Sequence, residues 1–155
     1  MTGYAVFVAR VFVVDPHARS RLAALVGLAG NHEAHCLESG ADLLKSVRRV
    51  VPEVVLVYGG GDPEHVQRTL RLILTDSGPK PRVGVYELAP HRAGPELAIG
   101  RWGADGWAGD PAAAGAFVDA LLRSEIAVRM GSFSPGLLAR FVSKLHAKKA
   151  LLKVL

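Results

Sequence analysis

The sequence predicts an α/β fold in which a doubly wound parallel sheet carries helices on both faces. Short apolar runs rich in β-branched residues alternate five times with segments of helical periodicity. Strands that alternate with helices in this way indicate βαβ units and a parallel sheet. Half of the 155 residues are hydrophobic and 21% are charged, so the chain can bury a core and lies outside disordered composition.

The first two expected strands are residues 10–15 and 32–37. Residues 10–15 form a β-branched run typical of a strand that is buried on both faces. Asp15 followed by Pro16 predicts a helix N-cap with proline in the first turn. An apolar stripe on this first helix, closed by Gly30, is made by Leu22, Leu25, Val26 and Leu28.

Residues 53–58 form the clearest central strand, preceded by a helix over residues 41–51 that Pro52 ends. Asp62 and Pro63 predict the cap and first turn of a third helix. The remaining elements are a strand at 82–87, a short helix around 95–102, a brief fifth strand at 104–108 and a fifth helix at 111–129.

Right-handed crossovers between parallel strands favour a sandwich whose functional groups lie at the carboxyl ends of the strands. The residues expected at this edge are Asp15, Tyr58, Tyr86 and Asp110. They are the first candidates for a functional site.

Two parts of the chain resemble the receiver domains of bacterial response regulators, over residues 10 to about 125. Residues 39–44 and 52–57 are similar to the second helix and third strand of that family. Residues 103–111, Gly-Ala-Asp-Gly-Trp-Ala-Gly-Asp-Pro, are similar to its fifth-strand segment, which usually reads Gly-Ala-Asp-x-Tyr-x-x-Lys-Pro. The resemblance implies a flavodoxin-like, five-stranded parallel sheet of order 2-1-3-4-5.

The resemblance also implies a phosphorylation pocket, and this sequence departs from it. The family holds Mg²⁺ with an acidic pair, phosphorylates an aspartate that ends the third strand, and contacts the phosphoryl oxygens with a Ser or Thr and a Lys. Those positions here are Asp15 with Pro16, then Tyr58, Tyr86 and Asp110. We therefore expect an atypical receiver without a phosphoacceptor, without Mg²⁺ or other cofactor, and without enzyme activity.

The aromatic residues near this pocket have two interpretations. Tyr58 and Tyr86 fill the space that Mg²⁺ and phosphate would take. Alternatively they line a small-ligand site together with Trp107, which occupies the place of the family's switch aromatic. The first interpretation is preferred.

Other motifs are weaker. The six histidines show no metal-ligand spacing, and the loop Gly59-Gly60-Gly61 lacks both the Walker lysine and the G-x-G-x-x-G spacing. The start of the chain lacks the basic segment of a signal peptide, and no apolar run is long enough to span a membrane. One cysteine, Cys36, permits no internal disulfide, so a cytoplasmic location is expected.

The basic charge is concentrated in a tail. Residues 126–155 carry six basic and no acidic residues, whereas residues 1–125 carry thirteen basic against fourteen acidic residues. We therefore expect two parts: a receiver-like domain at 1–125, and at 126–155 the end of the fifth helix plus a basic amphipathic helix. Residues 134–142 resemble the linker of NarL/LuxR-type regulators. For this helix, dimerisation or packing on its own domain is favoured over binding to a membrane surface.

The resemblance to receiver domains and to the NarL/LuxR-type linker implies the regulatory domain of a phosphorylation-independent transcriptional regulator. It would be a homodimer with a possible small-molecule ligand, and it would reach DNA only through a helix-turn-helix domain that is not in this chain. The alternative is a stand-alone receiver-like adaptor for other proteins. The gene beyond Leu155 discriminates the two, while the ligand, the target genes and the dimer geometry stay open.

Overall fold

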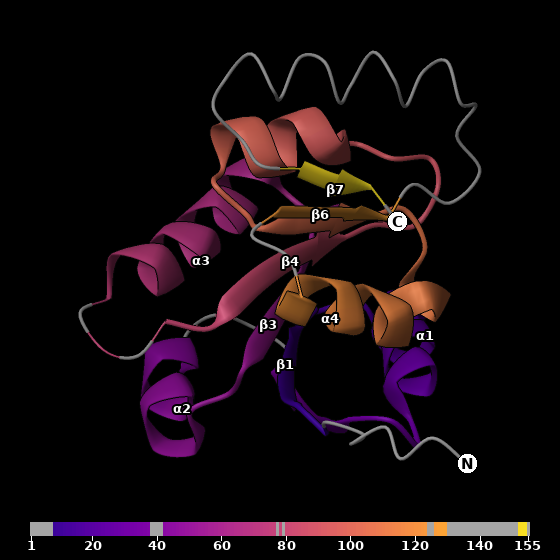
Figure 1. Cartoon of the computed structure of the whole chain (residues 1–155). Helices are drawn as coiled ribbons and strands as arrows, with labels where there is room; N and C mark the ends of the chain where they lie inside the picture. Colours follow the sequence, from indigo (N-terminus) through magenta and orange to yellow (C-terminus); the bar gives the residue numbers. More distant parts are fainter. Residues whose placement is uncertain are drawn as a thin grey trace.

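The computed structural model describes residues 8–37, 42–76, 78, 80–123, 126–129 and 152–154. These residues form a parallel sheet of seven strands in the order β2-β1-β3-β4-β5-β6-β7 (Figure 1). The strands are β1 (Arg10–Val14), β2 (Glu33–Leu37), β3 (Val54–Tyr58), β4 (Arg82–Tyr86), β5 (Gly106–Ala108), β6 (Ile126–Arg129) and β7 (Leu152–Val154). The predicted order 2-1-3-4-5 is confirmed, and two further strands extend it.

The crossovers between the strands are mostly helical. The helices are α1 (Ala18–Leu28), α2 (Leu43–Val50), α3 (Pro63–Thr75), a π-helical segment η1 (Glu96–Arg101), a 3₁₀ turn η2 (Pro111–Ala113) and α4 (Ala114–Arg123). The predicted cap of α3 is confirmed, because the Asp62 carboxylate accepts a hydrogen bond from the Glu64 backbone N–H and Pro63 opens the helix.

The sequence prediction was wrong about the end of the fifth helix, which it placed at residue 129. The helix α4 ends at Arg123, and residues 126–129 form strand β6 against β5. The run Ile126-Ala127-Val128 contains two β-branched residues, and the free edge of β5 offers it unpaired backbone groups. Residues 152–154, expected in the amphipathic helix, form strand β7 against β6. The rest of that expected helix lies outside the described residues.

Two apolar layers enclose the sheet. One layer packs α2, α3 and η1 on the face that carries Val55, Val85 and Trp107. The other packs α1 and α4 on the face that carries Leu56 and Tyr86. Figure 1 shows α2 and α3 on one side of the central strands and α1 and α4 on the other. Alternate residues of each strand therefore enter different layers.

Helix α1 buries only part of the predicted stripe, because Leu28 is buried and Leu25 packs against the core. Leu22 and Val26 are exposed, at 63% and 67%, whereas Ser20, Ala24 and Leu28 are buried. The buried residues recur every four positions and are small at the start of the helix, which lets α1 lie close to the sheet and to η2. The contact is tightest at Gly27, where an added Cβ would lie 2.7 Å from the Ala112 carbonyl oxygen.

Candidate functional site

The candidate site lies at the carboxyl edge of the sheet, where strands β1, β3 and β4 end. Asp15 follows β1 directly, and Tyr58 and Tyr86 are the last residues of β3 and β4. The parallel register pairs Tyr58 with Tyr86, so their side chains leave the sheet on the same face. The fold therefore brings three of the predicted site residues together.

Asp15 is fully buried, and its carboxylate is held by three donors. The Tyr86 hydroxyl and the Ser20 hydroxyl each donate to Oδ2 at 2.5 Å. The His17 backbone N–H donates to Oδ1 at 2.8 Å. These bonds give both oxygens of the buried carboxylate a hydrogen-bond partner.

Asp15 is not the N-cap that the sequence predicted. The helix α1 begins at Ala18, and its N-cap is His17, which makes no side-chain capping bond. Pro16 lies exposed between the two residues. The carboxylate still receives a backbone N–H two residues ahead, but its second oxygen turns inward to hydroxyls on α1 and β4. A hydroxyl on α1 and a tertiary donor on β4 thus replace the local capping role.

The two tyrosines remain neutral phenols. Burial raises the pKa of Tyr86, and the hydrogen bond to Asp15 raises it further because it favours the protonated hydroxyl. Burial also raises the pKa of Tyr58, with the Asp15 charge as the next cause. Both hydroxyls are therefore available as donors, and neither is poised to act as a phenolate nucleophile at neutral pH.

Three rings cover this edge of the sheet. The ring centroids of Tyr58 and Tyr86 are 5.6 Å apart, and the His17 ring lies 5.2 Å from that of Tyr58 in an edge-to-face contact. The loop Gly59–Gly61 makes room for neighbouring side chains: a Cβ at Gly60 would overlap the Tyr58 ring. Gly59 and Gly60 therefore accommodate neighbouring side chains.

Asp110 has a different role from Asp15, Tyr58 and Tyr86. Its side chain is exposed, and its Oδ1 accepts a hydrogen bond from the Ala112 backbone N–H at 2.9 Å. Asp110 is therefore the N-cap of the 3₁₀ turn η2, with Pro111 in the first position. The carboxylate stabilises the start of the helix that follows β5.

A second buried carboxylate, Glu87, was not among the predicted site residues. It follows β4 directly, is fully buried, and accepts four hydrogen bonds. The backbone N–H groups of Arg92, Ala93 and Gly94 donate to it at 2.8–2.9 Å, and the Trp107 indole N–H donates at 2.8 Å. An acidic residue that ends an apolar strand is the signal in the sequence, because acidic side chains are seldom fully buried without partners.

The three-residue ligand site proposed from the sequence does not form. Trp107 is fully buried and pairs in register with Val85, which places it on the face opposite Tyr86. Its ring contacts His91 at a centroid distance of 4.9 Å, and its N–H is bonded to Glu87. Tyr58 and Tyr86 lie together, and Trp107 belongs to the other core layer.

The described part of the chain contains no cluster of three or more His, Cys, Asp or Glu side chains arranged to hold a metal ion. In that same part, no helix has the length and apolarity required to cross a membrane.

Comparison with known proteins defines the fold. No protein-family model matches the chain, and no curated protein matches it. Chemotaxis response regulator CheY4 of Vibrio cholerae aligns with a TM-score of 0.58 at 14% identity, over 74% of this chain and 99% of that protein. A LuxR-family two-component response regulator from Aurantimonas sp. SI85-9A1 gives 0.60 at 18% identity, over 90% and 99%.

NtrX from Brucella abortus, solved in complex with ADP, gives a TM-score of 0.63 at 18% identity, over 90% of this chain. This chain spans 29% of NtrX. With its parallel sheet of order 2-1-3-4-5 in the first five strands and its flanking helices, the chain has the fold of response regulator receiver domains.

Proposed function

We propose that this chain is a regulatory receiver-like domain that works without phosphorylation. The observation that supports the proposal is the set of hydrogen bonds that the Asp15 carboxylate accepts. In the resemblance described above, this residue would contribute to an acidic pair that binds Mg²⁺. Here both of its oxygens accept hydrogen bonds from protein groups, and the Tyr86 hydroxyl is one of the donors.

The neighbouring groups support the same proposal. Phosphoryl transfer to a receiver requires a carboxylate acceptor and positive charge around the transferred group. At the end of β3 the chain has Tyr58, whose hydroxyl cannot form an acyl phosphate. After β5 it has Asp110, which carries a negative charge where the family has a lysine. The cluster is better suited to holding the ends of β1, β3 and β4 together.

The output that we propose is transcriptional regulation through a homodimer. The support is the receiver fold, together with the linker-like sequence at residues 134–142, which lie outside the described residues. Reading the gene beyond Leu155 tests the link to DNA. A helix-turn-helix domain encoded there would support a regulator, and its absence would favour an adaptor.

Incubation with acetyl phosphate and Mg²⁺ tests the proposal directly. We expect intact-protein mass spectrometry to find no phosphorylated species, while a phosphorylatable receiver treated in parallel gains one phosphate. The physical reasons are that Tyr58 offers no acceptor carboxylate and that both Asp15 oxygens already accept hydrogen bonds from protein groups. A base-labile phosphate on this chain would disprove the proposal.

The variant Tyr58→Asp is the matched control. It restores a carboxylate at the end of β3 but leaves the Asp15 oxygens bonded to Ser20 and Tyr86, and it leaves Asp110 in place. We expect this variant to remain unlabelled. Labelling of Tyr58→Asp would show that the acceptor alone was missing, and that the bonding of Asp15 does not prevent phosphorylation.

A further inference from the structure

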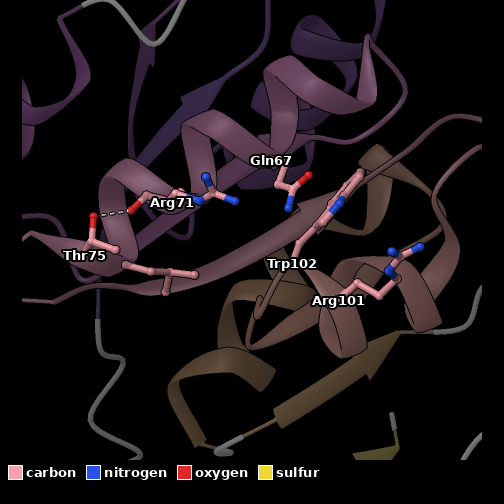
Figure 2. A pocket seen from close by; sticks show the side chains of 6 residues that line it. Gln67, Arg71, Thr75, Arg101 and Trp102 are labelled. Carbon is pink, nitrogen blue, oxygen red and sulfur yellow. Dashed lines mark hydrogen bonds between the residues drawn. The ribbon is translucent and has the colours of Figure 1, made fainter.

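A separate cavity of about 180 Å³ lies between helix α3 and the segment that ends η1. It is on the face of the sheet opposite Tyr86, beside the core layer that contains Trp102. Figure 2 shows it from close by. Its lining residues are Gln67, Arg71, Leu74, Thr75, Arg101 and Trp102.

Helix α3 presents one regular row of side chains to this cavity. Gln67, Arg71 and Thr75 are four residues apart, so they lie on one face of the helix. The Thr75 hydroxyl donates to the Arg71 carbonyl at 2.6 Å, which fixes the Thr75 side chain at the end of the row. In Figure 2 the Arg71 side chain extends from α3 towards Gln67 and Trp102.

The cavity is electropositive. Arg71 and Arg101 are both exposed, neither forms an ion pair with another described residue, and no carboxylate is among the lining residues. Asp76, which follows α3, pairs with Arg48 at 2.6 Å. Figure 2 shows the Arg71 and Arg101 side chains on opposite sides of Trp102, so positive charge borders the hollow from two sides and favours an anion there.

We propose that this cavity binds a phosphate-type oxyanion, either free phosphate or the phosphoryl group of a small organic molecule. Guanidinium groups match the geometry of phosphate oxygens, and the Gln67 amide provides a further donor. The cavity is smaller than the roughly 300–1,000 Å³ of pockets that enclose whole drug-sized ligands, so a head group fits it best. The buried Trp102 ring forms an apolar wall for a group attached to the phosphate.

The proposal does not depend on the regulatory function proposed above, because it uses none of the residues around Asp15. Isothermal titration calorimetry of the full chain with inorganic phosphate and with phenyl phosphate tests it, in a buffer free of other oxyanions. We expect saturable binding of at least one probe at a single site. Trp102 fluorescence should change with the same midpoint, and the change should be lost in Trp102→Phe.

Three glutamine variants locate the site. We expect Arg71→Gln and Arg101→Gln each to weaken binding about tenfold. Arg68→Gln removes the same charge from an exposed position of α3 outside the lining, and we expect it to bind like the original chain. Circular dichroism and thermal unfolding confirm that each variant is folded before its affinity is compared.

Each outcome decides the proposal. Similar midpoints for the two probes would identify a site for free phosphate, and at least about tenfold tighter phenyl phosphate binding would identify an organic phosphoryl compound. Absence of saturable heat with both probes would overturn the proposal. Equal weakening by Arg68→Gln and Arg71→Gln would overturn it as well, because it would reveal general charge attraction instead of a site.

Discussion

Two consecutive residues of the chain, Tyr86 and Glu87, organise opposite faces of the sheet. Tyr86 donates to Asp15 on the side of α1 and α4, and Glu87 accepts from Trp107 and the following loop on the other side. Their opposite directions follow from the two-residue repeat of an extended strand. Both contacts are buried, so each polar group depends on its partner.

Glu87→Gln should destabilise the protein by about 2–4 kcal/mol. The amide removes the charge that four N–H groups share, and its own NH₂ group would face donors. Urea unfolding measures the difference. Glu64→Gln, at an exposed position in the first turn of α3, is the control and should change stability by less than about 1 kcal/mol. Similar stability of the two variants would contradict the role of Glu87.

Tyr86 should make the protein less stable at high pH. Its pKa is raised in the folded protein, so above pH about 10 the unfolded chain loses this proton first. The contribution is therefore complete below pH 10 and falls as the pH rises further. Between pH about 8 and 11, the original chain should lose about 1 kcal/mol more unfolding free energy than Tyr86→Phe. Parallel pH profiles in urea unfolding would refute this assignment.

At the scale of elements, close approach of α1 and α4 decides how the second core layer is built. A Cβ at Gly115 would lie 2.6 Å from the Gly27 carbonyl oxygen, which is backbone and cannot turn aside. Gly27 itself lies against the Ala112 carbonyl of η2. The two glycines therefore set the distance between the helices, and a local propensity argument would miss this.

The variant Gly115→Ala tests whether helix propensity or the close contact between α1 and α4 has the larger effect on stability. Helix propensity alone predicts stabilisation by about 1 kcal/mol, whereas the overlap with Gly27 predicts destabilisation by about 1–3 kcal/mol. We expect the overlap to dominate. Thermal and urea unfolding provide the measurement, with Gly61→Ala as a control because its added Cβ would meet only the His17 ring, at 3.8 Å. A more stable Gly115→Ala would show that the helices separate freely.

Asp105 is another residue whose role depends on neighbouring elements. It precedes β5, and its Oδ2 accepts a hydrogen bond from the Val83 backbone N–H of β4 at 2.8 Å. Burial raises the pKa of Asp105, and the Val83 N–H and the Arg82 charge oppose that rise. The Gly-Ala-Asp motif thus fixes the start of β5 against β4.

At the scale of the whole molecule, the tail contains both the excess of basic charge and the last two strands of the sheet. Residues 126–155 carry six basic and no acidic residues, and strands β6 and β7 continue the sheet beyond β5. The homodimer stays a prediction. Its test must separate the apolar pattern of residues 131–155 from the backbone pairing of residues 152–154.

Deletion of residues 131–155 should lower the mass measured by light scattering from that of a dimer to that of a monomer. The double variant Leu138→Glu, Phe141→Glu keeps strand β7 and breaks the apolar pattern, so we expect it to dissociate as well. A tail that packs only on its own domain would give the same monomeric mass before and after deletion, and dimerisation would then be excluded.

The sequence by itself determined the alternation of strands and helices and the position of Asp15, Tyr58 and Tyr86 at one edge. Each follows from patterns carried by neighbouring residues or from the handedness of crossovers. The resemblance to receiver domains led to the same fold, and the structural comparisons agree with it.

The tertiary structure alone decided which of these residues touch. Trp107 faces away from Tyr86 because the β4–β5 register pairs it with Val85, and register joins strands about twenty residues apart. The Asp15 side chain does not cap α1, and it accepts hydrogen bonds from hydroxyl groups on α1 and β4. Residues 126–129 became a strand because β5 left an edge open to them. In each case at least one deciding partner is distant in sequence, so local periodicity does not predict the contact.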